Sequence, residues 1–387
     1  MGANPVTAGP VLCVVGARPN FMKMAPLLAA FARDPALPRA VLVHTGQHYD
    51  ASMSDRLFAD LRLPAPDLNL EVGSGTHAVQ TAEIMRRFEP VLDQYRPSVV
   101  VVVGDVNSTL ACSLVAVKRR VPVALVEAGL RSFDRGMPEE INRLLTDQIA
   151  DLLYTTERSA AANLAREGVP PERIVFAGNV MIDSLRDNLP RAVPPAESLR
   201  RAGLDPAPVR DERGFGAVTL HRPANVDRPE ALRDCLEILR AVSAKLPLLC
   251  ALHPRTRGNV DRFGLAALLA TPAIAVLPPQ GYLEMLGLMA HAAVVLTDSG
   301  GMQEETTALG VPCLTMREST ERPITVDEGT NTIVSRDRAL TLRLLDEILA
   351  GGGKRGRAPE LWDGHAAERI AAHLGAWIGA RHATMGA

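Results

Sequence analysis

The stretch AAVVLTDSGGMQEETTALGVPCLTMRESTERPITVDEGTNTIV, residues 292–334, decides the fold. Its apolar run at 292–296 predicts a short, buried parallel strand that ends in the turn TDSGG. Residues 302–309 then predict a helix that Gly310 ends, and residues 311–316 predict the next strand. A strand, a glycine turn and a helix N-terminus together can hold a phosphate, because the first N–H groups of a helix have no partner within it.

Two acids in the first turns of this predicted helix leave two interpretations open. Glu304 and Glu305 could simply favour the helix dipole, as acids near a helix N-terminus do. One of them could instead accept hydrogen bonds from the hydroxyls of a bound ribose.

The composition of the 387 residues predicts a soluble protein of two α/β domains. A hydrophobic content of 47% and a charged content of 22% are typical of globular chains. The formal net charge of −2 and the 4% of aromatic residues give no signal for nucleic acid or a membrane surface. We expect no membrane-spanning segment and no signal peptide, since no apolar run approaches the roughly 20 residues that span a bilayer. Five scattered cysteines predict neither a disulfide framework nor a metal site, and favour the cytoplasm.

A strand–turn–helix pattern also opens the chain, where residues 11–15 lead into the turn GARPN. The G-x-G-x-x-G fingerprint is missing here, so we do not expect NAD to bind. Arg18 and Lys23 flank the turn. They could be solvated charges, or they could face a phosphate at the end of the strand.

Acids follow two later predicted strands of this half, at 98–103 and 121–126. Asp105 comes directly after the valine-rich strand at 98–103, Glu127 ends the following strand, and Glu139 opens a later helix. Three carboxylates at one site would raise at least one pKa, which suits acid–base chemistry. The alternative is helix capping by Asp105 and ordinary ion pairing with nearby arginines such as Arg143.

Histidines end two predicted strands of the second half. His221 is followed by Arg222, and His253 is followed after one proline by Arg255. A lone histidine is more often structural, but a histidine beside arginine at a strand end favours a phosphate-binding or acid–base role.

The predicted domain bounds are residues 1–182 for the first domain and 183–365 for the second. Prolines and charges cluster between residues 183 and 212, where we expect a linker and a mobile connector. Residues 366–387 are expected to contain a terminal helix.

Across nearly its full length the chain resembles the non-hydrolysing UDP-N-acetylglucosamine 2-epimerases. The resemblance rests on ordered motifs, namely GARPNFMKMAPL, HTGQH, GDVNSTLA, VEAGLRS, MPEEINR, VTLHRPANVD, ALHPRTR, TDSGGMQEE and TERP. It implies two Rossmann-like domains facing across a cleft, as in glycosyltransferases of the B type, with the acid–base residues on the first domain and UDP on the second. It also implies that the last helix packs back on the first domain.

The reaction implied by the resemblance inverts C2 of UDP-GlcNAc to give UDP-ManNAc. It eliminates UDP to form 2-acetamidoglucal and then adds UDP back after the opposite face is protonated, with no metal or redox cofactor. The resemblance assigns acid–base or leaving-group roles to Asp105, Glu127, Glu139 and His221. It places in the substrate-binding set Arg18, Lys23, Arg143, His253, Arg255, Ser299, Gly300, Gly301, Glu305 and Arg322.

Departures from the usual family pattern bear on the substrate and on regulation. Asn20 and Pro223 replace charged residues of GTRPE and HRREN, which changes the contacts expected near the cleft. GQHYDASM replaces GQHREQM and an arginine of the following loop is replaced within residues 72–75, so we do not expect the second, activating UDP-GlcNAc site of some members. The HTGQHYD, SGTHA and LRSF stretches also resemble epimerases of UDP-2,3-diacetamido-glucuronate. Those relatives often lack the arginine that matches Arg322, so its presence favours UDP-GlcNAc.

Other functions remain open at this point. They are a glycosyltransferase of the same fold, a hydrolysing epimerase that releases free ManNAc, and a non-catalytic nucleotide-sugar binder. The resemblance further implies a cytoplasmic homodimer that serves polysaccharide synthesis, with no nucleic-acid or membrane partner.

Overall fold

The structure, a computed structural model, describes residues 9–47 and 51–385. The expectations that concern residues 1–8 and the His48–Tyr49–Asp50 part of GQHYDASM lie outside these ranges.

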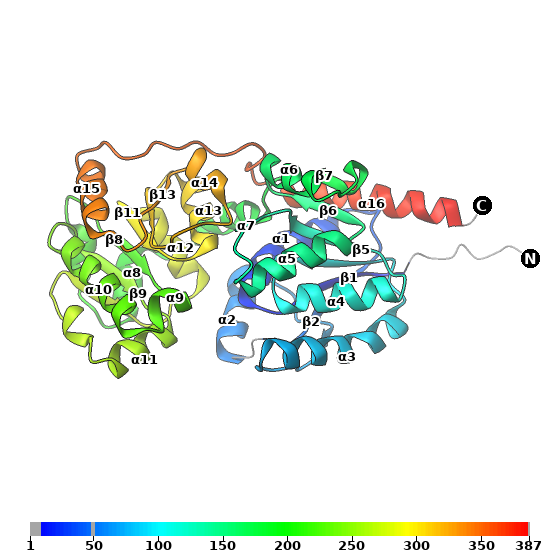
Figure 1. Cartoon of the computed structure of the whole chain (residues 1–387), viewed down its shortest axis with the longest axis horizontal. Coiled ribbons are helices and arrows are strands. Elements are labelled where there is room, and N and C mark those ends of the chain that lie inside the picture. The colour runs from blue at the N-terminus through cyan, green and yellow to red at the C-terminus, as the bar shows by residue number, and fades with distance from the viewer. Residues whose placement is uncertain (1–8, 48–50, 386–387) are drawn as a thin grey trace, which may run out of the picture. The chain divides into compact units, whose positions relative to one another are not determined.

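The chain forms two compact units, each built on a parallel sheet (Figure 1). Unit 1 comprises Met1–Ser184 and Glu360–Ala387, and unit 2 comprises Leu185–Pro359. Helices alternate with strands along both units, which is the pattern that gives parallel sheets with crossover helices.

Unit 1 holds a seven-stranded sheet in the order β3-β2-β1-β4-β5-β6-β7, with every pair parallel. Its strands are β1 (Val11–Val15), β2 (Ala40–His44), β3 (Leu68–Asn69), β4 (Val99–Val103), β5 (Val123–Ala128), β6 (Leu152–Thr155) and β7 (Ile174–Phe176). The middle strands are apolar and buried, as expected for strands covered on both faces.

The helices of unit 1 follow its strands in sequence and end with the C-terminal helix. They are α1 (Arg18–Arg33), α2 (Ala51–Leu61), α3 (His77–Tyr95), α4 (Asn107–Lys118), α5 (Pro138–Ile149), α6 (Arg158–Arg166), α7 (Val180–Asn188), whose end belongs to unit 2, and α16 (Ala366–Met385). The helix α16, red in Figure 1, packs against α1. Its start is capped by Asp183, whose carboxylate accepts hydrogen bonds from the backbone N–H groups of Ala366 and Ala367 at 3.2 and 2.7 Å.

Unit 2 holds a six-stranded parallel sheet in the order β10-β9-β8-β11-β12-β13. Its strands are β8 (Gly216–Thr219), β9 (Leu248–Ala251), β10 (Ile274–Leu277), β11 (Val294–Thr297), β12 (Cys313–Thr315) and β13 (Asn331–Ile333). Its helices are α8 (Pro195–Arg201), α9 (Pro223–Val226), α10 (Pro229–Ser243), α11 (Pro254–Arg262), α12 (Tyr282–His291), α13 (Gly300–Leu309), α14 (Pro323–Asp327) and α15 (Arg338–Leu349).

Each sheet has one point where the strand order changes direction. In unit 1 the chain builds outward from β1 on one side and from β4 on the other, and in unit 2 the same happens at β8 and β11. In open α/β sheets, ligands bind outside the carboxyl ends of the strands at this switch point. The turns after β1, β4, β8 and β11 are therefore the places to look for function.

The segment expected to be a linker and mobile connector is helical over much of its length. It contains the end of α7, the helix α8, and short 3-10 turns at Leu189–Arg191 and Ala207–Arg210. Pro195 stands in the first turn of α8, where the missing N–H has no helical partner to lose. Prolines in the expected linker thus stand at the starts of helical segments, which their clustering in the sequence did not indicate.

Candidate functional site

Asn20 joins the two strand ends at the switch point of unit 1. Its side-chain oxygen accepts hydrogen bonds from the N–H groups of Gly16 and Ala17, both at 3.1 Å, after β1. Its amide nitrogen donates to the carbonyl of Val103 at the end of β4, at 2.9 Å. The asparagine that departs from the family pattern therefore fixes the turn between these strands.

Lys23 and Glu127 form a buried ion pair beside that turn. The Lys23 Nζ lies 2.6 Å from Glu127 Oε2, and both side chains are almost fully buried. A Cβ placed on Gly104 would lie 2.9 Å from the same Nζ, so the ammonium also rests against the backbone turn that precedes Asp105. Glu127 has a positive φ of 70°, a backbone conformation that a non-glycine residue rarely adopts.

Asp105 and Glu140 share one arginine. Arg143 pairs with Asp105 through Nη1 and with Glu140 through Nη2, the latter at 2.6 Å. Glu140 also accepts hydrogen bonds from the backbone N–H groups of Ser132 and Phe133 at 3.0 and 2.9 Å. Burial alone would raise the pKa of Glu140, but these hydrogen bonds and the charge of Arg143 outweigh it and hold the pKa below its usual range.

The structure brings together four predicted residues of unit 1, including Arg143 with Asp105, and places two others in the first turns of helices. Asp105, Glu127 and Lys23 lie at neighbouring strand ends, because the N–H of Gly104 bonds the carbonyl of Val126 at 3.0 Å. Arg18 is exposed at the start of α1, and Glu139 is half-buried in the first turn of α5.

A buried aspartate, Asp298, orients His221 at the switch point of unit 2. The His221 Nδ1 lies 3.0 Å from Asp298 Oδ1, and the same carboxylate accepts hydrogen bonds from the backbone N–H groups of His221 and Arg222. The side-chain amide of Asn225, in α9, also donates to it at 3.1 Å. Burial would raise the pKa of Asp298, but the hydrogen bond and charge of His221, followed by the other donors, hold the pKa below its usual value.

The glycine pair expected in a loop forms the first turn of α13. Ser299 is the N-cap residue, and the helix begins at Gly300 and Gly301. The free N–H groups of this turn therefore lie at the carboxyl end of β11, which is a suitable place for an anion. A Cβ placed on Gly300 would lie only 2.5 Å from Glu321 Oε1 and 2.8 Å from Arg322 Nη1, so this close approach requires glycine.

The residues packed against that helix start form a buried cluster of charges. Arg322 pairs with Glu304 at 2.7 Å and with Glu321 at 2.6 Å, and Arg317 pairs with Glu321 at 2.7 Å. Arg222 lies 3.8 Å from Glu321 and adds a third cation, so three arginines face two glutamates. Asp298, which directly precedes the N-cap Ser299, adds a third carboxylate, so the acids and the arginines at this helix start are equal in number.

Glu321 ionises readily in this cluster. Burial would raise its pKa, but the charges of Arg322 and Arg317 and the hydrogen bond from Arg317 outweigh burial and place the pKa well below its usual range.

The remaining predicted residues of unit 2 are placed as follows. Glu305 is buried and accepts a hydrogen bond from the Tyr282 hydroxyl at 3.1 Å. His253 is exposed and caps α11, with its ring centroid 6.3 Å from that of His221. Arg255 pairs with Asp227, with Nε 2.7 Å from the carboxylate.

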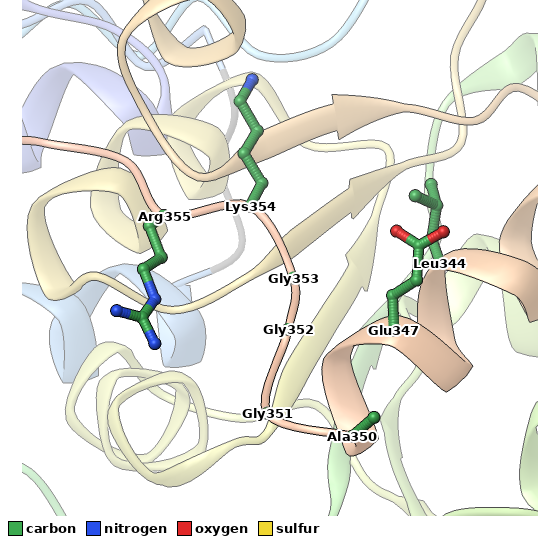
Figure 2. A pocket seen from close by; sticks show the side chains of 8 residues that line it. All are labelled: Leu344, Glu347, Ala350, Gly351, Gly352, Gly353, Lys354 and Arg355. Atoms are coloured by element: carbon green, nitrogen blue, oxygen red, sulfur yellow. The ribbon is translucent and has the colours of Figure 1, made fainter.

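A hollow of about 690 Å³ in unit 2 lies away from these residues, between α15 and the glycine loop that follows it (Figure 2). Figure 2 shows the side chains of Lys354 and Arg355 leaving that loop in different directions, so they do not converge on one ligand. An adjoining hollow is lined by residues that precede β11, β12 and β13. Both hollows therefore lie toward the amino ends of the strands, opposite the edge where His221 and Asp298 meet, and we place the candidate site at the latter edge.

Within the described ranges, no group of three or more His, Cys, Asp or Glu side chains is placed to hold a metal ion. None of the helices among these residues is long and apolar enough to cross a membrane.

Three partners of the predicted residues were missed from the sequence. Asp298 directly follows an apolar strand, which is the signal that identified Asp105. Glu140 stands three residues before Arg143 on one helix, a spacing that places the two side chains together. Glu321 has Arg317 four residues before it and Arg322 directly after it, and only its third partner, Arg222, comes from a remote segment.

The sequence was then compared with known protein families and curated proteins. A family model described as UDP-N-acetylglucosamine 2-epimerase matches residues 30–375. The UDP-N-acetylglucosamine 2-epimerase of Methanocaldococcus jannaschii is 39% identical over 92% of this chain and 96% of its own length. The UDP-2,3-diacetamido-2,3-dideoxy-D-glucuronate 2-epimerase of Pseudomonas aeruginosa is 41% identical over 85% of this chain and 89% of its own.

Solved structures agree with these relatives. The M. jannaschii UDP-GlcNAc 2-epimerase in complex with UDP-GlcNAc and UDP matches with a TM-score of 0.81 and 38% identity, covering 94% of this chain and 99% of that one. The Neisseria meningitidis UDP-GlcNAc 2-epimerase bound to UDP-GlcNAc matches with a TM-score of 0.80 and 26% identity, over 94% and 99% of the two chains. The two α/β units thus have the glycosyltransferase-B-like fold of these neighbours.

Proposed function

Because the chain belongs to the UDP-N-acetylglucosamine 2-epimerase family, we propose that it interconverts UDP-GlcNAc and UDP-ManNAc. In this proposal the enzyme removes the C2 proton and UDP to form 2-acetamidoglucal. It then protonates C2 from the opposite face and adds UDP back. The observation that carries the proposal is the placement of two carboxylates, Asp105 and Glu127, at the ends of neighbouring strands. A C2 inversion needs groups that take a proton from one face and give one to the other.

Unit 1 supplies the acid–base residues in this proposal. Asp105, Glu127 and Glu139 form the set that handles the C2 proton, and Arg143 and Lys23 hold the first two of them in place through ion pairs. Arg18, exposed at the start of α1, contributes to binding the sugar diphosphate.

Unit 2 binds the nucleotide and the leaving diphosphate in this proposal. The first N–H groups of α13, at Gly300 and Gly301, receive the diphosphate, together with the side chains of Ser299 and the neighbouring Arg322. Glu305 accepts hydrogen bonds from the ribose. His221, assisted by His253 and Arg255, handles the proton or charge of the departing diphosphate.

A second candidate substrate is UDP-2,3-diacetamido-glucuronate, on which the P. aeruginosa relative acts by name. Identities of 39% and 41% to the two kinds of relative do not separate the candidates. A uronate brings an additional carboxylate, and burying that charge requires a cation to compensate it. Lys23, Arg143 and Arg322 are each already engaged by a carboxylate of this chain, which favours the neutral sugar.

The test is incubation with UDP-GlcNAc in D₂O followed by proton NMR. We expect deuterium at C2 and the appearance of UDP-ManNAc. UDP that accumulates from UDP-GlcNAc alone would indicate a hydrolysing epimerase, and UDP released only with an added acceptor would indicate a glycosyltransferase. Unchanged UDP-GlcNAc together with C2 exchange in UDP-2,3-diacetamido-glucuronate would establish the second candidate.

We further infer a cytoplasmic homodimer. All five cysteines are buried free thiols, which fits a reducing compartment. Light scattering of the purified chain is expected to give twice the mass of 41.5 kDa, and a monomeric mass would contradict the inference.

A further inference from the structure

The pair of His221 and Asp298 joins an accessible imidazole to an inaccessible carboxylate. The His221 side chain is 39% exposed, whereas the Asp298 side chain is fully buried. Their contact runs through Nδ1, so the second ring nitrogen, Nε2, is the one that remains to face a ligand.

Asp298 is held by more than its contact with the histidine. The backbone N–H groups of His221 and Arg222 and the amide of Asn225 all donate to it, so the carboxylate cannot turn away from the ring. Asn225 is fixed in turn, because its amide also donates to the carbonyl of Met316 at 2.7 Å and its oxygen accepts from Arg336 at 3.1 Å.

The other titratable groups near the pair do not replace this carboxylate. The His253 ring lies 6.3 Å away, and the Arg222 guanidinium is directed to Glu321. The buried thiol of Cys235 has its pKa raised to about 12, first by burial and then by the negative charge of Asp298.

We propose that Asp298 is a positioning residue that fixes the tautomer of His221, with the proton on Nδ1 and Nε2 presented to the leaving diphosphate. In a buried pair of this kind the carboxylate accepts from Nδ1–H, so only Nε2 can exchange a proton with a ligand. The inference rests on the proposed function for the identity of the ligand.

The proton balance of the step is as follows. A carboxylate of unit 1 takes the C2 proton, the C1=C2 double bond forms, and the bond between C1 and the diphosphate oxygen breaks with its electron pair going to oxygen. His221 first takes a proton from solvent on Nε2 and then gives that proton to the departing oxygen, while the ring keeps its Nδ1–H on Asp298. Addition of UDP in the reverse direction returns the proton to Nε2.

The first test needs no variant at Asp298. Long-range ¹H–¹⁵N NMR of the wild-type chain over a range of pH, with the His221 signals assigned by their loss in His221→Gln, should show that the neutral ring carries its proton on Nδ1 and has a bare Nε2. A protonated Nε2 with a bare Nδ1 would overturn the proposal. This readout is independent of turnover, so it separates failure of this inference from failure of the proposed function.

The second test compares Asp298→Asn with Asp346→Asn, which removes an aspartate that pairs with Lys245 on the surface of the same unit. Asp298→Asn should lower kcat by about 10² to 10⁴-fold, since an amide at this place favours the wrong tautomer. KM and UDP affinity should stay within a few-fold, and Asp298→Glu should restore part of kcat. Asp346→Asn should behave as wild type.

A folded Asp298→Asn with wild-type kcat, or with UDP affinity reduced as much as kcat, would show a merely structural role. If this variant does not fold, the tautomer of the wild-type chain decides.

Discussion

The two switch points hold their carboxylates differently. In unit 1, cationic side chains pair with the acids. In unit 2, backbone N–H groups, an amide and one imidazole hold Asp298. Lys23 pairs with Glu127, and Arg143 pairs with Asp105. Asp298 instead receives two backbone N–H groups, an asparagine amide and His221. The two sheets nevertheless share one strand order, with β8 and β11 in the places of β1 and β4.

The segments that follow β1 in unit 1 and β8 in unit 2 account for the different partners of the carboxylates. In unit 1 the long helix α1 begins at once and brings Lys23 over the end of β4. In unit 2 only the short helix α9 follows β8, and it brings Asn225 to Asp298. One topology thus provides carboxylates paired with Lys23 and Arg143 in one unit, and a carboxylate held by backbone and amide donors and a histidine in the other.

The largest effect is expected where an acid of unit 1 is neutralised. Asp105→Asn should reduce deuterium exchange at C2 by about 10² to 10⁴-fold, because an amide cannot accept the proton. UDP affinity, which we assign to unit 2, should stay within a few-fold in isothermal titration.

The matched control for this change is Asp93→Asn, which removes an exposed aspartate of the same unit that pairs with Arg119. We expect wild-type exchange from it. Wild-type exchange in Asp105→Asn would remove this carboxylate from the proposed chemistry and would weaken the contrast between the units.

The second prediction concerns stability at the two switch points. Lys23→Met should lower the free energy of unfolding by about 3–5 kcal/mol, because it leaves the buried Glu127 without its ammonium partner. The double variant Lys23→Met with Glu127→Gln should recover most of that loss, as measured by urea unfolding.

The corresponding change in unit 2 should be milder. His221→Gln removes one partner of Asp298, which keeps its two backbone donors and Asn225, so a loss of about 1–2 kcal/mol is expected. Equal losses of unfolding free energy in Lys23→Met and His221→Gln would contradict this contrast. Glu127 would then depend on its ammonium partner no more than Asp298 depends on its histidine.

Much of this arrangement could be predicted from the sequence because strand ends carry it. The apolar runs located the strands around Asp105, Glu127 and His221, and parallel strands collect their carboxyl ends at one edge. The same reasoning applied to β11 would have found Asp298. The resemblance to a family supplied the roles of the residues, which the spacing alone left open.

Long-range partners could not be predicted in this way. Glu321 meets Arg222 only because the turn after β8 and the segment before α14 come together in the folded unit. Asn20 looked like a lost charge in the sequence, yet its amide reaches the end of another strand at Val103, 83 residues away along the chain. Hydrogen-bond partners of this kind depend on three-dimensional packing, for which local patterns carry no signal.

The third prediction uses acid to compare the two units. Glu140 in unit 1 and Glu321 in unit 2 both have pKa values below the usual range, and Glu321 lies further below it. A carboxyl group whose pKa is lower in the folded state than in the unfolded state stabilises the fold above its unfolded pKa. That stabilisation is lost as the pH falls toward the folded pKa, because the unfolded chain then binds more protons.

Urea unfolding between about pH 5 and about pH 3 should therefore show stability falling, with Glu321 contributing on the order of 1–3 kcal/mol and Glu140 contributing less. Glu321→Gln should flatten this dependence more than Glu140→Gln does. The reverse order would mean that the acids of unit 1 are held more tightly as anions than the charge cluster of unit 2.

The smallest effect on stability is expected at Glu305 of unit 2, which accepts a hydrogen bond from the uncharged Tyr282 hydroxyl. Tyr282→Phe removes the hydroxyl that donates to Glu305 at 3.1 Å and should lower the free energy of unfolding by about 1 kcal/mol. Burial and the charge of Glu305 raise the pKa of Tyr282 well above its usual value, so the hydroxyl remains a donor at any pH in which the protein is studied.

UDP affinity should change by less than about threefold in Tyr282→Phe, whereas Glu305→Ala should weaken it by about 1–3 kcal/mol if the carboxylate accepts ribose hydroxyls. Equal losses of UDP affinity in the two variants would show that the tyrosine is needed to aim the carboxylate. Unchanged affinity in both would remove Glu305 from the nucleotide site and leave it as a buried structural acid.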